Sequence, residues 1–260
     1  MIERFSRIES LVGEDAMKRL AGLRIAIFGV GGVGSVCAEC LVRSGARNLT
    51  LVDSDCVAES NINRQLPAFV STIGRPKVDV LAERFADINP EARIVPVQAL
   101  YSMDDRGRFD FANFDVVVDA IDSLAHKIDL LATASEAGCK VFCSLGAAGK
   151  LDPTMVRTAS IWQTKGCPLG KLVRNGLRKR GFAGDFMAVY SEEPSVAAGL
   201  SLAGRATEGR PDSRNSATTF GENACEVHGN SRKATILGSA MPVTAAFGLA
   251  LSSLVIRSVL

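Results

Sequence analysis

Short apolar runs alternate with amphipathic segments along the first part of the chain. The apolar runs predict five strands, a buried one at residues 25–28 and others at 49–52, 93–97, 115–120 and 140–145. The segments between them that show helical spacing of apolar residues are 33–44, 78–89 and 123–138. Strands that alternate with helices are typical of a mainly parallel sheet with helices on both faces. We therefore predict an α/β, Rossmann-like fold.

The second half of the chain departs from this alternation. Residues 195–232 are rich in small and polar side chains, and residues 241–256 carry no charge. We predict a mobile loop for the first segment and, at about 241–257, a helix buried against the sheet. At about 16 residues, the uncharged run is shorter than the roughly 20 that cross a bilayer, although membrane attachment or a dimer contact stays an alternative.

Chain length and composition fit one large core or a core with an appendage. The 260 residues are 47% hydrophobic and 22% charged, as in globular proteins. We divide the chain into a core at 1–150 and a C-terminal part at 151–260 that completes the sheet.

A glycine-rich turn follows the first predicted strand. The sequence GVGGVG at 29–34 places Gly29, Gly31, Gly32 and Gly34 before the next helix, and Asp53 ends the second strand. Glycine permits unusual backbone angles and a close approach of phosphate or helix to the main chain. The helix N-terminus offers unpaired N–H groups to an anion, and an acid about 20 residues farther accepts hydrogen bonds from a ribose. These features predict a nucleotide site without separating NAD from ATP.

Side chains suited to phosphate groups follow the predicted ribose acid. They are Asp55, Asn61, Asn63, Arg64 and Lys77. The amides and the guanidinium lie just past the ribose acid, where they can reach along a triphosphate, and a planar guanidinium binds two oxygens at once. A dinucleotide-dependent oxidoreductase does not need this run.

Carboxylates lie at the end of the fourth predicted strand, in the sequence DAID at 119–122, with Ser123 opening the next helix. The carboxyl ends of parallel strands face the ligand crevice in such sheets. Magnesium takes one or two carboxylates together with phosphate oxygens and water. Asp122 is therefore our magnesium candidate, and Asp119 either shares this role or caps the helix.

Basic side chains gather in one segment of a chain whose net charge is only +2. They are Lys165, Lys171, Arg174, Arg178, Lys179 and Arg180. A helix from Pro168 places three of them along one stripe, and its apolar face would be formed by Leu169, Leu172, Val173 and Leu177. Such a cationic stripe suits an RNA backbone, although a solvated helix face is the simpler alternative.

Seven cysteines without the spacing of a secreted scaffold favour a reducing cytosol, and the polar start at 1–7 does not resemble a signal peptide. Cys37 and Cys40 have metal-ligand spacing but lie on the predicted helix after the glycine turn, where we expect them to pack. A sulfur-transfer thiol at Cys167 or Cys225 stays open.

Five ordered motifs together resemble one known superfamily. They are GVGGVG (29–34), DSD (53–55), SNINRQ (60–65), GRPK (74–77) and DAID (119–122). In this order they are similar to the ubiquitin-activating-enzyme-like superfamily of ATP-dependent adenylating proteins. Three further stretches resemble its tRNA threonylcarbamoyladenosine dehydratases: the start RFSRIESLVGEDAMKRL, SLGAAGKLDPTMV (144–156) and, more weakly, PVTAAFG (242–248).

The resemblance implies roles for individual residues. The glycine turn would contact ATP, and Asp53 would bind its ribose. The phosphates would be bound by Asn63, Arg64 and Lys77. Asp122 would bind magnesium. Asp55, Asn61 and Ser123 would complete the nucleotide site. Arg7 matches an arginine that enters the partner subunit's active site, which implies a homodimer. The catalytic set is therefore Arg7, Arg64, Lys77 and Asp122.

The function implied is the ATP-dependent cyclisation of threonylcarbamoyladenosine in tRNA, beside the anticodon, through an acyl-adenylate. A monovalent cation is a further implied cofactor. The main alternative is an adenylyltransferase for the C-terminal glycine of a ubiquitin-like sulfur carrier, with a sulfur-transfer protein docking near Cys225. Such enzymes commonly hold zinc through two Cys-x-x-Cys pairs in the C-terminal half, and this half has only isolated cysteines, so we expect no zinc. A Rossmann oxidoreductase or a nucleotide-sensing protein is a more distant alternative.

Overall fold

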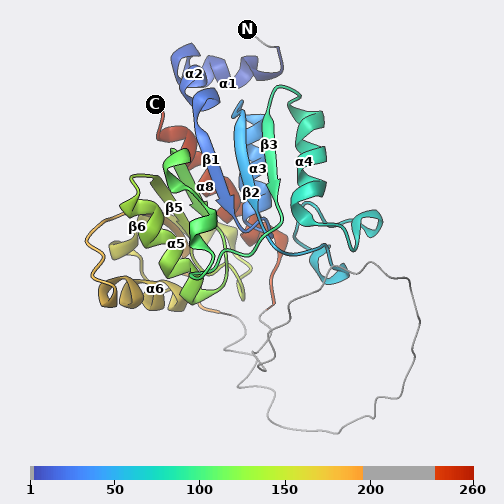
Figure 1. Cartoon of the computed structure of the whole chain (residues 1–260). Coiled ribbons are helices and arrows are strands. Elements are labelled where there is room, and N and C mark those ends of the chain that lie inside the picture. The colour runs from blue at the N-terminus through green and yellow to red at the C-terminus, as the bar shows by residue number, and fades with distance from the viewer. Residues whose placement is uncertain (1–2, 196–237) are drawn as a thin grey trace, which may run out of the picture.

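One seven-stranded sheet runs through the chain. The structure is a computed structural model that describes residues 3–195 and 238–260. The strands are β1 (Arg24–Phe28), β2 (Asn48–Val52), β3 (Arg93–Val97), β4 (Val116–Asp119), β5 (Lys140–Ser144), β6 (Val156–Ser160) and β7 (Met187–Ser191). Their order is β3-β2-β1-β4-β5-β7-β6, and every neighbouring pair is parallel except β6 with β7 (Figure 1).

Helices cover both faces of this sheet. They are α1 (Ser6–Val12), α2 (Glu14–Gly22), α3 (Gly34–Arg43), α4 (Lys77–Ile88), α5 (Leu124–Glu136), α6 (Pro168–Lys179) and α8 (Met241–Arg257). Ile25 and Ile27 of β1 pack in one core with α3, α4 and α8, whereas Ala26 and Phe28 pack in the other core with α5 and α6. Successive side chains of a strand point to opposite faces, so a buried parallel strand needs apolar residues at every position.

The predicted Rossmann-like fold is confirmed, and its five strands and three helices lie within two residues of their predicted bounds. The C-terminal part completes the sheet, but β6 and β7 were not predicted as strands. β6 is the antiparallel edge strand, and its sequence VRTAS leaves Arg157 and Thr158 exposed. A half-exposed edge strand shows no apolar run.

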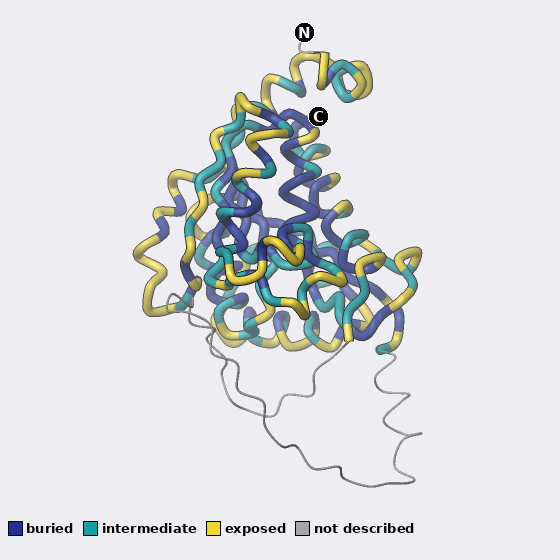
Figure 2. Tube along the Cα trace, turned by 90° about the vertical axis from the view of Figure 1, so that its right-hand side faces the viewer, coloured by how far each residue is buried: buried dark blue, intermediate teal, exposed yellow. Residues whose placement is uncertain are grey.

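The apolar C-terminal run forms α8, and its predicted burial against the body of the protein is confirmed. Val243, Phe247, Leu251 and Val255 are fully buried, as the dark interior of Figure 2 illustrates. Gly248 lets α8 approach α3, because a Cβ there would lie 2.6 Å from the carbonyl oxygen of Val33. None of the helices in the described ranges is long and apolar enough to span a membrane.

The N-terminal helices lie at the amino ends of the strands. α2 leads into β1 through Leu23 alone, and Arg19 donates a hydrogen bond to the carbonyl of Val259, 2.6 Å away. Arg7 on α1 is exposed at this end. The glycine turn follows the other end of β1, about 16 Å away along a five-residue strand. The expectations for Cys225 and for the loop at 195–232 fall almost wholly outside the described residues.

Candidate active site

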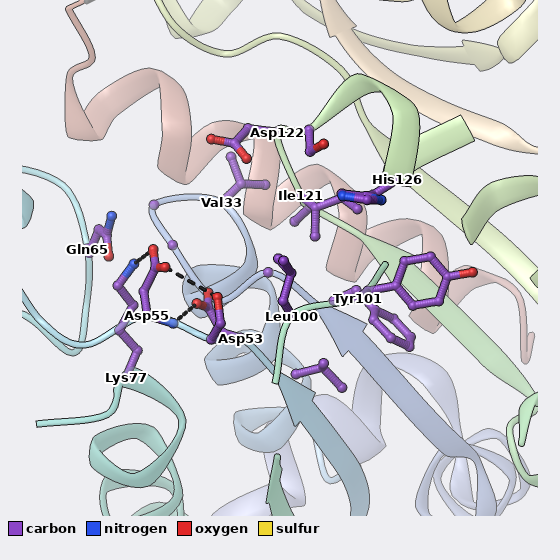
Figure 3. A pocket seen from close by; sticks show the side chains of 18 of the residues that line it. Val33, Asp53, Asp55, Gln65, Lys77, Leu100, Tyr101, Ile121, Asp122 and His126 are labelled. Carbon is purple, nitrogen blue, oxygen red and sulfur yellow. Dashed lines mark hydrogen bonds and ion pairs between the residues drawn. The ribbon is translucent and has the colours of Figure 1, made fainter. Parts of the chain in front are cut away.

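A pocket opens at the carboxyl ends of β1 and β4. From these neighbouring strands the chain runs outward in opposite directions, through β2 and β5, which makes their junction the topological switch point where open α/β sheets bind ligands. The pocket has a volume of about 340 Å³. Its walls include most of the predicted nucleotide residues, namely Gly29, Gly31, Gly32, Asp53, Asp55, Asn61, Arg64, Lys77, Asp122 and Ser123 (Figure 3).

The glycines of the turn have two different functions. Gly29 has φ +83°, and a Cβ on it would lie 2.7 Å from the carbonyl oxygen of Ala120, while a Cβ on Gly34 would lie 1.8 Å from the carbonyl oxygen of Gly29. These two positions exclude any side chain for reasons of backbone geometry. Gly31 and Gly32 border the pocket, where a Cβ would lie 3.6 Å and 3.2 Å from the nearest atoms. The absence of a side chain at these two positions therefore keeps space in the pocket for a ligand, whereas Gly29 and Gly34 are required by the backbone of the turn.

The carboxylate of Asp53 is held rigidly at the end of β2. It accepts hydrogen bonds from the backbone N–H of Val30 at 2.8 Å and of Asp55 at 2.9 Å. Burial raises the pKa of Asp53, whereas Lys77 and the two backbone N–H groups oppose this shift. Since each carboxylate oxygen has a second lone pair, Asp53 can still accept hydrogen bonds from ribose hydroxyls.

Two cationic side chains, Lys77 and Arg64, line the pocket. Lys77, at the start of α4, is only 4% exposed, and its Nζ lies 2.8 Å from Asp55 Oδ2. The Arg64 Nη1 donates to the carbonyl of Ser60 and to Asn63 Oδ1, both at 2.9 Å. These bonds orient the guanidinium and leave its other donors for a ligand.

Asp122 and Asp119 occupy different environments. Asp122 is exposed at the pocket. Asp119 is fully buried and lies 2.6 Å from Nζ of Lys127, which also donates to the carbonyl of Ser144 at 3.0 Å. Burial opposes the charged form of Lys127, but the adjacent carboxylate raises the pKa of Lys127 above its usual value. Our expectation that Asp119 binds magnesium or caps the helix was wrong, because its carboxylate is paired inside the core.

The pocket has a polar end and an apolar end. Gln65 and Lys77 lie at the polar end, and Asp53 lies between them and the apolar Leu100 and Ile121 (Figure 3). Gln65 is nine-tenths buried, and its Oε1 lacks a hydrogen-bond partner among the described residues. A nucleotide matches this polarity, with phosphates at one end and the base at the other.

Sequence reasoning did not single out four lining residues whose polar side chains could contact a ligand. They are Gln65, Tyr101, His126 and Thr244. Gln65 lies inside the quoted SNINRQ motif and Thr244 inside PVTAAFG, so a signal existed for both. Tyr101 and His126 belong to no motif, and only the fold brings them to the pocket.

Other predicted residues lie away from the pocket. Asn63 is exposed and donates a hydrogen bond to the carbonyl of Ser239 at 2.8 Å, and Gly34 is enclosed in the backbone of the turn. Arg7 belongs to α1, which lies at the opposite end of the sheet (Figure 1). Cys167 is buried before α6, where its Sγ accepts the N–H of Gly170 at 3.4 Å. Cys37, on α3, is also buried in the core.

The basic segment forms α6, with Lys165 before the helix and Arg180 directly after it. Val173 and Leu177 are buried on α6, but Leu172 is 49% exposed, so its assignment to the apolar face was wrong. Arg174 donates to Thr164 Oγ1, Arg178 lies over the ring of Trp162 at 5.3 Å, and Arg180 pairs with Asp129. Lys165, Lys171 and Lys179 are exposed, and none of the ion pairs among the described residues involves them.

Few side chains of the described residues are placed to bind a metal ion. In the described parts of the chain, three or more His, Cys, Asp or Glu side chains do not gather anywhere into a metal-binding group. Magnesium that shares phosphate oxygens and water requires only one or two carboxylates, and the exposed Asp122 at the pocket fits this need.

Comparisons with known proteins identify the family of this chain. The sequence profile of the ThiF family matches residues 5–260. The tRNA threonylcarbamoyladenosine dehydratase of Bacillus subtilis is 39% identical over 196 residues, which are 75% of this chain and 77% of that protein. The molybdopterin-synthase adenylyltransferase of Escherichia coli is 35% identical over 141 residues, which are 53% of this chain and 54% of that protein.

Solved structures match over nearly the whole chain. The structure of E. coli tRNA N6-threonylcarbamoyladenosine dehydratase in complex with ATP aligns with a TM-score of 0.79 at 29% identity, covering 99% of this chain and 93% of that chain. The complex of the same enzyme with AMP aligns with the same TM-score and identity. The chain therefore belongs to the ThiF family, and within that family to the tRNA threonylcarbamoyladenosine dehydratases.

Proposed function

We propose that the chain uses ATP to cyclise threonylcarbamoyladenosine in tRNA with loss of one water. The threonyl carboxylate attacks the α-phosphate of ATP, which forms an acyl-adenylate and releases pyrophosphate. An atom of the carbamoyl group then attacks the activated carbonyl, closes the ring and expels AMP, which carries away the carboxylate oxygen. The observation that carries this proposal is the pocket at the switch point. It is lined by a carboxylate placed for a ribose (Asp53), by two cationic side chains (Arg64 and Lys77) and by apolar residues, in a chain similar to known dehydratases.

The residues of the pocket account for binding and for charge stabilisation. Asp53 binds the ribose through the oxygen lone pairs that its two backbone partners leave free. Arg64 and Lys77 neutralise the negative charge that grows on the phosphates during attack, which is the electrostatic contribution on which phosphoryl chemistry depends. No enzyme nucleophile is needed, since the attacking groups belong to the substrate.

Asp122 is our proposed ligand for magnesium, with phosphate oxygens and water completing the coordination. The ion would supply further positive charge beside the phosphates. A monovalent cation is a second proposed cofactor, and it rests on the family resemblance alone.

Nucleoside mass spectrometry tests the proposed reaction. The protein is incubated with ATP, magnesium and tRNA that carries threonylcarbamoyladenosine, and the digested nucleosides are analysed beside an AMP assay. We expect the modified nucleoside to lose the mass of one water, with one AMP released for each nucleoside converted. ATP turnover with unchanged RNA would contradict this function and favour the alternative, in which a carrier protein with a C-terminal glycine is adenylated.

Arg7 is proposed to act in the pocket of the partner subunit. It lies on α1, at the end of the sheet opposite to the pocket of its own chain, so it can contribute only across a dimer. Arg7→Ala and Arg64→Ala homodimers should both be inactive, whereas subunit exchange between them creates heterodimers with one intact pocket. We expect about one quarter of wild-type activity in an equal mixture. If Arg7 acted within its own chain, the mixture would stay as inactive as its parents.

The exposed lysines around α6 are the proposed centre of the RNA contact. Lys165, Lys171 and Lys179 keep their charges free for phosphate oxygens, whereas Arg174 and Arg178 are partly engaged by Thr164 and Trp162. Counterion release from RNA would make this contact sensitive to salt.

A further inference from the structure

The connection between β3 and β4 lacks an α-helix. Residues 98–115, here called the crossover, contain only short 3-10 turns at Arg106–Arg108 and Phe111–Asn113. Because a segment with few backbone hydrogen bonds of its own opens easily, side-chain contacts must hold the crossover in place. Its first residues, Ala99, Leu100 and Tyr101, line the apolar end of the pocket. The position of the crossover therefore shapes the end at which a base would bind.

Tyr101 joins the crossover to the body of the protein. Its side chain is 2% exposed, and its ring packs edge-on against Phe28, with the centroids 5.5 Å apart. Phe28 itself lines the pocket. The Tyr101 hydroxyl points away from the pocket in Figure 3 and donates to Asp129 Oδ2 at 2.8 Å.

The carboxylate of Asp129 accepts hydrogen bonds from the crossover and from the end of α6. It lies on α5, is 1% exposed, and accepts hydrogen bonds from Arg106 of the crossover at 3.3 Å and from Arg180, the residue after α6. Arg180 also donates to Thr133 Oγ1 at 3.3 Å. Although burial acts in the opposite direction, the hydrogen bonds from Arg180 and Tyr101 lower the pKa of Asp129. Burial and the neighbouring carboxylate raise the pKa of Tyr101, so the phenol remains a donor.

We propose that Arg180 is a positioning residue for the nucleotide site: through Asp129 and Tyr101 it holds the crossover against the base end of the pocket. This role rests on the proposed binding of ATP in that pocket. Arg180 thus has a different role from the exposed lysines of the same basic segment, because its guanidinium already pairs with the buried carboxylate of Asp129. Removing it leaves the Asp129 charge less compensated and loosens the Tyr101 contact.

The test measures the binding of two ligands to variants of Arg180, of Tyr101 and of the neighbouring Lys179. ATP and ribose 5-triphosphate, which lacks the base, are titrated calorimetrically into the wild type, Arg180→Ala, Tyr101→Phe and Lys179→Ala, without tRNA. We expect Arg180→Ala and Tyr101→Phe to weaken ATP binding by about 3- to 30-fold, the range of coupling through packed networks. Binding of ribose 5-triphosphate should change less than about twofold, since the phosphate end is intact.

Lys179→Ala serves as the matched control, and we expect it to bind ATP like the wild type while its KM for tRNA rises. With tRNA present, Arg180→Ala should raise the KM for ATP and leave kcat nearly constant. Equal weakening of both ligands by Arg180→Ala would indicate general loss of structure and overturn the inference, as would unchanged ATP binding in this variant. A wild type that binds no ATP would overturn the proposed function and this inference together.

Discussion

Arg64→Ala is expected to reduce the rate of nucleoside dehydration by about 10²- to 10³-fold, the effect of removing one preorganised donor from a transition state. The guanidinium lines the pocket and is oriented by the carbonyl of Ser60 and by Asn63 Oδ1. Negative charge on the phosphates grows as the carboxylate attacks, so the loss should appear in kcat as well as in kcat/KM. Single-turnover release of pyrophosphate with saturating ATP measures this step directly.

Arg75→Ala is the control for this substitution. Arg75 lies on the segment that leads to Lys77, but its guanidinium pairs with Glu83 on the surface and it does not border the pocket. We expect its activity to match that of the wild type. A similar loss in both variants would show that the effect of Arg64→Ala comes from the fold of this segment and not from the phosphate contact.

Lys127→Met is expected to lower the free energy of unfolding by about 3–5 kcal/mol, because it leaves the buried carboxylate of Asp119 without its partner. Both side chains are fully buried, 2.6 Å apart, between β4 and α5. The melting temperature should fall by on the order of 10 °C. Calorimetry or denaturant unfolding measures the loss, and ATP affinity should fall as well, because Asp119 ends β4 three residues before Asp122 of the pocket.

A charge-free pair distinguishes lost charge compensation from lost packing. Asp119→Asn combined with Lys127→Met removes both charges, and we expect it to recover much of the stability lost in Lys127→Met. Lys18→Met, which breaks an exposed ion pair with Glu14, should leave the melting temperature unchanged. If the double variant were as unstable as Lys127→Met, packing of the lysine stem would account for the effect.

The strands, the glycine turn and most of the pocket could be predicted because each depends on residues close together in the chain. Gly29 and Gly34 exclude side chains through contacts within or beside the turn, and Asp53 lies at the end of the strand that follows. Apolar runs predicted the central strands because both faces of those strands are buried. The edge strand β6 was missed because none of its residues is fully buried, so its sequence shows no apolar run.

The sequence by itself thus determined the α/β fold, the nucleotide motif and the residues that it carries in order. Only the tertiary structure decided how distant charges pair. Asp119 was a metal candidate until Lys127 was seen beside it, and Arg180 was an RNA candidate although it pairs with Asp129, 51 residues away. A local motif constrains the backbone of one continuous segment, whereas an ion pair between segments depends on which faces the packed core brings together. Periodicity and spacing along the chain do not encode that choice.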